Sequence, residues 1–318
     1  MPLLDLPNEI LDIIATYIPS TDRVALLSTS RKCNQSFEHI HYRQDAYSED
    51  PAALIWAAEN GNVQTIKKAL AAACNGVPLP QGSVGRGPLS IAAKAGHELA
   101  VKLLLAVESV DPNEKDDHCQ TPLSLASLEG HTGVVKILLL ASGINPDPID
   151  TYGRSALSAA AGAGHVEIVK LFLAAEGVDV DSREVLSQSP LWRAVDGGHM
   201  EVVKLLIDTG RVDVDIKDAY GNTPLSWAAW TANPDILELL LATKRVDPSS
   251  RDNAGQTPLT KAAICGNESV VKILLSTEGV DPDSTDNQES TPLSFASARG
   301  HDAVVKLLLQ RGASILAT

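Results

Sequence analysis

Apolar, small and polar positions recur along most of this chain in one fixed order. From about residue 52 onward, a short segment beginning Thr-Pro-Leu continues with small residues and a Gly, and a second apolar segment follows. In one copy the second segment carries Val134, Ile137 and Leu138, the spacing of one helix face. Thr is a favoured N-cap, and Pro suits the first helical position because its missing N–H would have no partner there. The pattern therefore predicts two short antiparallel helices in each copy.

The copies are 34 residues apart. Complete Thr-Pro-Leu motifs begin at Thr121, Thr223, Thr257 and Thr291, and degenerate ones begin at Gly87, Ser155 and Ser189. Nine residues after most of these positions stands a Gly that favours the left-handed end of a helix, at Gly96, Gly130, Gly164, Gly198, Gly266 and Gly300. A fixed period of this size indicates a solenoid of stacked helix pairs.

The copy that begins at Thr223 departs from this order. Ala232-Asn233-Pro234 stands where most copies have Gly-His. Because a left-handed Ala is strained, we expect this turn to be rebuilt around Pro234.

These motifs resemble the ankyrin repeat, with Ser in place of the family's usual His after Thr-Pro-Leu and one additional residue in the finger that joins two repeats. Tetratricopeptide repeats share the 34-residue period but lack Thr-Pro-Leu and Gly-His. The resemblance implies an all-α ankyrin-repeat solenoid of about eight helix-turn-helix units over residues 52–318. The expected repeats are 52–86, 87–120, 121–154, 155–188, 189–222, 223–256, 257–290 and 291–318.

Residues 1–45 follow a different pattern. Pro7 and Glu9 favour a helix start, and Ile10, Ile14 and Ile18 lie on one helical face. Three short helices are expected in this head, and residues 46–51 are expected to form a linker. So small a head has a weak core of its own, so it should dock on the solenoid or on a partner.

The head resembles an F-box, and the matching residues include Leu6, Pro7, Ile10, Leu11, Ile14 and Ile18. The resemblance implies that these residues bind the Skp-type adaptor of a cullin–RING ubiquitin ligase while the ankyrin groove binds the target protein. Cys33 stands where the motif commonly has Trp. The alternative is a helical cap on an ankyrin scaffold or inhibitor with no ligase association.

Composition narrows the class of partner and the compartment. The net charge of −14 disfavours nucleic acid and anionic membrane as main partners. Four scattered cysteines, with neither a signal peptide nor a long apolar run, favour a reducing compartment, either the cytosol or the nucleus. We expect a monomer when no partner is bound.

No constellation of residues suggests catalysis. Five histidines share one repeat position, but equivalent positions of stacked helices lie about 8–10 Å apart, too far for one zinc ion. The glycines around residues 82–87 lack the Gly-Lys-Ser/Thr ending of a phosphate loop. We therefore expect no catalytic residue, no metal and no cofactor, and an enzyme is the third and least favoured interpretation.

The ankyrin resemblance also implies where a partner would bind, namely on the finger tips and the exposed side of each first helix. Trp, Tyr and Arg dominate interface energetics, and at or next to such positions stand Tyr152, Arg154, Trp192, Arg193, Tyr220, Asn222, Trp227 and Trp230. The tryptophans could instead pack between helices. The acidity of the chain predicts a basic or mixed-charge target segment.

Overall fold

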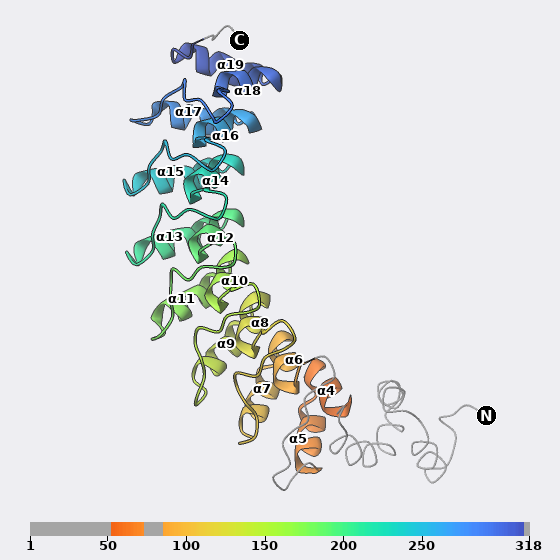
Figure 1. The fold of residues 1–318 in the computed structure, drawn as a ribbon. Helices are drawn as coiled ribbons and strands as arrows, with labels where there is room; N and C mark the ends of the chain where they lie inside the picture. Colours follow the sequence, from red (N-terminus) through yellow and green to blue (C-terminus); the bar gives the residue numbers. More distant parts are fainter. Residues whose placement is uncertain (1–51, 73–84, 315–318) are drawn as a thin grey trace, which may run out of the picture. The chain divides into compact units, whose positions relative to one another are not determined.

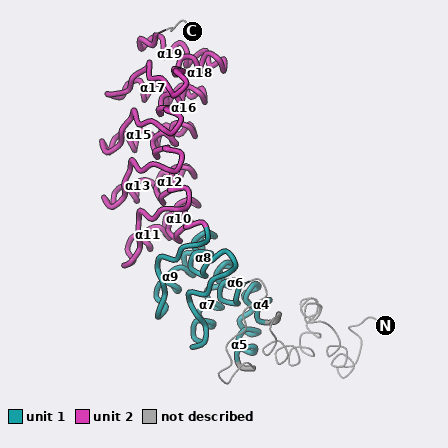
Figure 2. Tube along the Cα trace, in the orientation of Figure 1, with its two compact units in different colours: residues 1–151 teal, residues 152–318 magenta. Residues whose placement is uncertain are grey.

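The computed structural model describes residues 52–72 and 85–314, so the expected head and linker lie outside the described residues. The chain divides into two compact units, an N-terminal unit of residues 1–151 and a C-terminal unit of residues 152–318 (Figure 2). Sixteen helices occur in the described residues, in successive antiparallel pairs. The predicted all-α arrangement of helix pairs is confirmed there.

The described part of the N-terminal unit contains three helix pairs (Figure 1). They are α4 (Ala52–Glu59) with α5 (Val63–Ala72), α6 (Pro88–Lys94) with α7 (Glu98–Leu105), and α8 (Pro122–Glu129) with α9 (Thr132–Leu139). The first helices α4, α6 and α8 pack side by side in one layer, and α5, α7 and α9 form a second layer.

The C-terminal unit contains five helix pairs. They are α10 (Ala156–Gly162) with α11 (Val166–Ala174), α12 (Pro190–Asp196) with α13 (Met200–Asp208), α14 (Pro224–Trp230) with α15 (Pro234–Ala242), α16 (Pro258–Cys265) with α17 (Glu268–Ser276), and α18 (Pro292–Ala298) with α19 (Asp302–Gln310). The first helices again form one layer and the second helices another. Each repeat is named below by its cap residue.

Small side chains allow the first helices to pack closely. Ala228 and Ala229 of α14 are completely buried, as are Ala262 and Ala263 of α16. Branched residues of the second helices, such as Val202 in α13, fill the space between the layers. Within each unit the core is therefore a double layer of Ala, Leu and Val, in which each pair buries its apolar face against its neighbours.

The helix starts follow the Thr-Pro-Leu motif. The hydroxyl of the cap residue accepts the backbone N–H three residues later in six repeats, at Thr121, Ser155, Ser189, Thr223, Thr257 and Thr291. Gly87 has no hydroxyl, and Glu114 supplies the acceptor instead, since Ser90 N–H donates to Glu114 Oε1 at 3.0 Å. A carboxylate from the following finger thus replaces a missing cap.

The helix ends confirm the left-handed glycines and correct one expectation. The predicted glycines at this position all have positive φ, from 70° at Gly198 to 85° at Gly130. Ala232 also adopts this conformation, with φ 59°, so the turn is not rebuilt as expected. Asn233 instead caps α15 through its side chain, and Pro234 takes the first helical position, so the ordinary turn is kept.

The histidine that follows the left-handed glycine links its repeat to the one before it, for example at His97, His131, His199 and His301. His97 Nε2 donates to Glu59 O at 2.9 Å and His301 Nε2 donates to Ile264 O at 3.1 Å. The ring also lies against the left-handed glycine of the preceding repeat: a Cβ added to Gly266 would be 2.5 Å from His301 Nδ1. The histidines thus serve the stacking of repeats.

Candidate partner-binding surface on the fingers

The fingers of the C-terminal unit are joined to one another by backbone hydrogen bonds. A finger is the loop between the second helix of one repeat and the first helix of the next, for example residues 175–189. Val185 N–H donates to Tyr152 O at 2.9 Å, and Ala219 N–H donates to Leu186 O at 2.9 Å. Asn253 N–H continues the ladder by donating to the oxygen of Tyr220 at 3.0 Å. This ladder fixes the spacing of the finger tips.

Three successive finger tips carry large apolar side chains. Tyr152, Leu186 and Tyr220 occupy the same position, immediately before a left-handed residue, and are 58%, 42% and 61% exposed. The equivalent residues in the next two fingers are Ala254 and Gln288. The apolar tips are therefore confined to one stretch of the C-terminal unit, and clustered exposed apolar surface marks interaction sites.

A pocket of about 430 Å³ opens between the first two of these tips. Its walls come from Tyr152, Arg154, Glu184, Val185, Leu186, Gln188 and Arg193. The Arg154 guanidinium carbon lies 5.4 Å from the centre of the Tyr152 ring, within the range of a cation–π contact. The predicted residues Tyr152, Arg154 and Arg193 thus line one pocket, and their contact with a partner stays a prediction.

Glu184 and Arg193 form a fixed ion pair in the wall of this pocket. Arg193 Nε and Nη2 donate to the two carboxylate oxygens of Glu184 at 3.0 and 2.8 Å. The hydroxyl of Ser158 donates to Glu184 Oε1 at 2.5 Å. In the next finger, the equivalent acid, Asp218, instead accepts the backbone N–H groups of its own turn, at Tyr220 and Asn222. The longer Glu184 side chain therefore anchors the pocket rather than the turn.

Two predicted site residues are buried. Trp192 is only 3% exposed, and its ring centre lies 4.9 Å from that of Trp227. Asn222 is also buried, with its amide nitrogen donating to Asp218 Oδ2 at 3.1 Å. The expectation that Trp192 and Asn222 offer partner-binding surface is corrected, because both side chains pack inside the repeat stack.

Trp227 and Trp230 extend the surface along the first helices. Trp227 is half-buried, and its indole N–H donates to Asp196 Oδ1 at 2.8 Å. Trp230 is 40% exposed, and Lys261 Nζ lies 5.6 Å from its ring centre. Trp230 thus presents an aromatic face beside a fixed cation.

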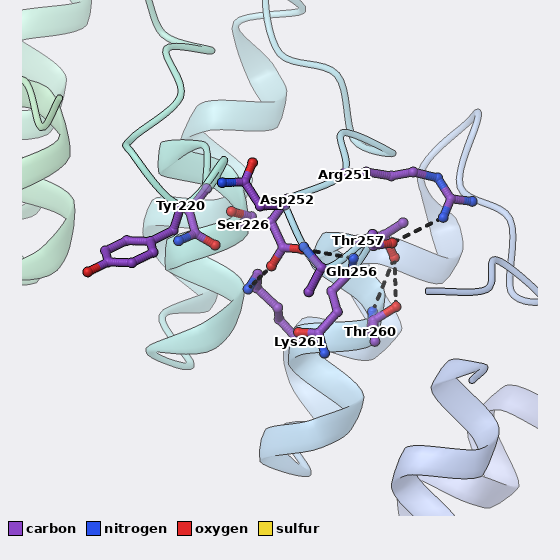
Figure 3. Close-up of polar contacts among 12 residues, drawn as sticks. Tyr220, Ser226, Arg251, Asp252, Gln256, Thr257, Thr260 and Lys261 are labelled. Atoms are coloured by element: carbon purple, nitrogen blue, oxygen red, sulfur yellow. Dashed lines mark hydrogen bonds and ion pairs between the residues drawn. The ribbon is translucent and has the colours of Figure 1, made fainter. Parts of the chain in front are cut away.

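Lys261 is held in place by Asp252, since Nζ and Oδ2 are 2.7 Å apart and both side chains are only 8% exposed. Figure 3 shows this pair beside the Thr257 cap, with the Tyr220 ring directed away from it. Lys261 and Asp252 occupy the repeat positions of Arg193 and Glu184, so the same acid–base pair recurs two repeats along.

Sequence reasoning missed Val185 and Leu186, of which Val185 is 70% exposed. It located the finger tips from their glycine, but this finger has Ser187 in the left-handed position, with φ 57°. The 34-residue period alone, counted from Tyr152, would have found Leu186. The repeat spacing therefore indicates this finger tip, whereas the glycine motif does not, because Ser187 replaces the glycine.

No group of three or more His, Cys, Asp or Glu side chains within residues 52–72 and 85–314 could hold a metal ion. None of the helices in these residues is long and apolar enough to cross a bilayer.

Comparison with protein families gives one match. A model of ankyrin repeats in three copies matches residues 25–116, 89–184, 157–252 and 232–318. The first match begins inside the segment expected to form the head, after Ile18 but before Cys33, so it overlaps the later part of the F-box-like segment. No curated protein matches the sequence.

Proposed function

Since the chain belongs to the ankyrin-repeat family, a family of protein–protein interaction modules, we propose that it binds a protein target through the fingers of its C-terminal unit and delivers that target to a cullin–RING ubiquitin ligase. Ankyrin-repeat proteins are typically binding modules without catalysis. The observation that carries the target-binding proposal is the row of exposed apolar tips at Tyr152, Leu186 and Tyr220, with the pocket beside it.

The surface is suited to binding because it is already rigid. The backbone ladder orders the tips, and the Glu184–Arg193 and Asp252–Lys261 pairs fix the charged side chains beside them. A partner therefore need not order these loops, and preorganisation of this kind increases affinity by lowering the entropic cost of association.

Affinity capture with matched variants tests the target-binding proposal. We expect Trp230→Ala and Leu186→Ser each to weaken capture of the target, with Trp230→Ala costing roughly 2 kcal/mol or more. Gln288→Ala, at the tip position of a polar finger, is the matched control and should capture as the wild type does. If Trp230→Ala unfolds the protein without a separate binding defect, Trp230 belongs to the core and this part of the site is wrong.

The ligase association rests on sequence alone. Leu6, Pro7, Ile10, Leu11, Ile14 and Ile18 stand in the order of an F-box and precede the first family match. We propose that this apolar face binds the Skp-type adaptor, which would place the protein in the cytosol or the nucleus. The competing proposal is an ankyrin scaffold or inhibitor whose N-terminal segment only caps the stack.

Co-purification with the adaptor separates these two proposals. Ile10→Ala and Ile14→Ala each remove buried apolar area worth on the order of 1–3 kcal/mol at such an interface. We expect adaptor recovery to fall in both variants while the far-UV circular dichroism of the repeats is unchanged. If the wild-type chain never retains the adaptor, the scaffold or inhibitor proposal replaces the ligase proposal.

A further inference from the structure

The fingers of the C-terminal unit carry a basic residue at one repeated position, although the chain as a whole has a net charge of −14. Arg183, Lys217 and Arg251 stand 34 residues apart, and all three are exposed. Lys217 Nζ donates to the backbone oxygen of Arg251 at 2.9 Å, so its side chain lies along the row of fingers. A basic row therefore accompanies the apolar tips.

The acidic side chains nearest the tips of these fingers are directed inward, although Asp179 and Asp213, farther from the tips, are exposed. Glu184 is paired with Arg193, and Asp218 accepts backbone N–H groups of its own turn. Asp181 attracts Arg183, but its Oδ2 accepts the N–H of Asp213, and its Oδ1 is buried. The exposed charge immediately beside the apolar tips is thus mainly positive, whereas the chain's overall acidity led to the expectation of a basic or mixed-charge target segment.

Arg183 makes no hydrogen bond or ion pair within the described residues, apart from its attraction to Asp181. It belongs to the same finger as Val185 and Leu186, which form walls of the pocket. On the other side of the pocket, Arg154 lies over Tyr152. One guanidinium group, that of Arg154, thus lines the pocket, and a second, that of Arg183, is exposed two residues before Val185 in the same finger. Guanidinium binds carboxylate by a planar two-point contact.

Resting on the proposed target-binding function, we infer that the fingers recognise a linear acidic peptide segment, with a bulky apolar side chain seated against Tyr152, Val185 and Leu186 and carboxylates facing Arg154 and Arg183. The pocket, of about 430 Å³, has room for several water molecules. Their release from apolar walls favours the anchor side chain, and the carboxylates set the orientation and speed association.

Unbiased selection of peptides tests this inference without assuming the target. A phage-displayed library of random twelve-residue peptides is selected on the immobilised full chain, and the recovered peptides are synthesised with a fluorescein label. We expect a consensus with Leu, Phe or Trp flanked by Asp or Glu. Binding by fluorescence polarisation should weaken about tenfold or more between ~50 and ~500 mM salt, because exposed charges are screened.

Charge-matched variants locate the binding. Arg183→Glu and Leu186→Ser should each weaken the selected peptides about tenfold. Lys204→Glu, on the exposed side of α13 in the following repeat, changes the net charge by the same amount and should leave affinity unchanged. Gln288→Ala is the control for a finger tip without a large apolar side chain.

The outcomes separate this inference from the function on which it rests. Basic or uncharged selected peptides that lose affinity in Leu186→Ser would overturn the acidic chemistry and leave the finger surface as the binding site. Peptides unaffected by Leu186→Ser and Arg183→Glu would count against the surface itself. If no consensus is recovered while target capture still depends on Leu186, the partner is a folded surface and the inference of a linear segment is wrong.

Discussion

Asp215 lies in the finger between α13 and α14 with its carboxylate partly buried. Burial raises its pKa, and the negative charges of Asp247 and Asp213 raise it further. Oδ2 accepts the N–H of Asp247 at 3.2 Å, while Oδ1 has no hydrogen-bond partner among the described residues. Burial and the neighbouring negative charges therefore disfavour the ionised form of Asp215, although its carboxylate accepts one hydrogen bond from the backbone of the next finger.

Asp215→Asn should stabilise the protein at neutral pH. Because the folded-state pKa lies above the unfolded value, the folded protein binds this proton more tightly, and the resulting stability is present at low pH and lost as pH rises through the folded pKa. Asn keeps the acceptor without the charge, so the free energy of unfolding should rise by about 0.5 kcal/mol at pH 7. Urea denaturation should show the gain disappearing near pH 3. Glu238→Gln, exposed on α15, is the control, and a gain that is equal at both pH values would contradict this account.

Sequence reasoning at the level of single residues succeeded where position alone decides the environment. Tyr152 and Tyr220 are exposed because finger tips project from the stack. It failed for Trp192, since the same helix position is small and polar in other repeats and only the contact with Trp227 shows that an indole fits there. Burial of a large residue depends on its neighbours in the next repeat, which the motif does not contain.

At the scale of the element, the start of α6 depends on a residue outside the helix. Gly87, the residue before α6, has no side chain that could cap the helix. Glu114, in the following finger, caps it instead, because its Oε1 accepts the Ser90 N–H at 3.0 Å. The Thr-Pro-Leu motif predicts the position of the helix but not this substitute. Ser90 and Glu114 are 24 residues apart in the sequence, so a motif of neighbouring residues cannot show that they are in contact.

Removing the substitute cap should weaken this repeat. Glu114→Ala leaves the Ser90 N–H without its acceptor and should lower the free energy of unfolding by about 1 kcal/mol. Glu114→Gln keeps an acceptor and should lose less. A Cβ at Gly87 would overlap Glu114 Oε2, so Gly87→Thr should be tolerated only together with Glu114→Ala, where it restores a local cap. Urea denaturation of the wild type, the three single variants and the double variant checks this order, and equal stability of wild type and Glu114→Ala would contradict it.

The turn between paired helices couples one repeat to the next. Where the left-handed residue is Gly266, the following repeat has His301 against it; where it is Ala232, the following repeat has the shorter Asn267. Asn267 Nδ2 donates to Ala232 O at 3.3 Å, a contact analogous to that of the histidine. Asn267 is shorter than His and leaves room beside Ala232, just as Asn233 leaves room beside Gly198, so the Ala232 turn keeps its ordinary form.

Gly266→Ala should be strongly destabilising in the wild-type background. The added Cβ costs about 1–2 kcal/mol of left-handed strain, and its contact with the His301 ring adds about 1–3 kcal/mol. Adding His301→Asn to Gly266→Ala should relieve the contact with the ring, so only that part of the lost stability should be recovered. Gly300→Ala is the matched control, because Gly300 has φ 72° with no atom within 4 Å of an added Cβ, so strain alone applies. A double-mutant cycle by denaturation measures the coupling, and a value near zero would refute the pairing.

At the scale of the whole molecule, stability comes from contacts between adjacent repeats. In the C-terminal unit, α18 packs on α16 and α19 packs on α17, with the same pattern in each earlier pair. Deleting residues 291–318 should therefore expose the apolar faces of α16 and α17, lowering the urea midpoint while the remaining repeats stay helical. Far-UV circular dichroism per residue should be nearly unchanged. The surface from Tyr152 to Trp230 lies in earlier repeats, so target capture should survive the deletion. Complete loss of helical signal would instead indicate one indivisible core, contrary to near-neighbour coupling.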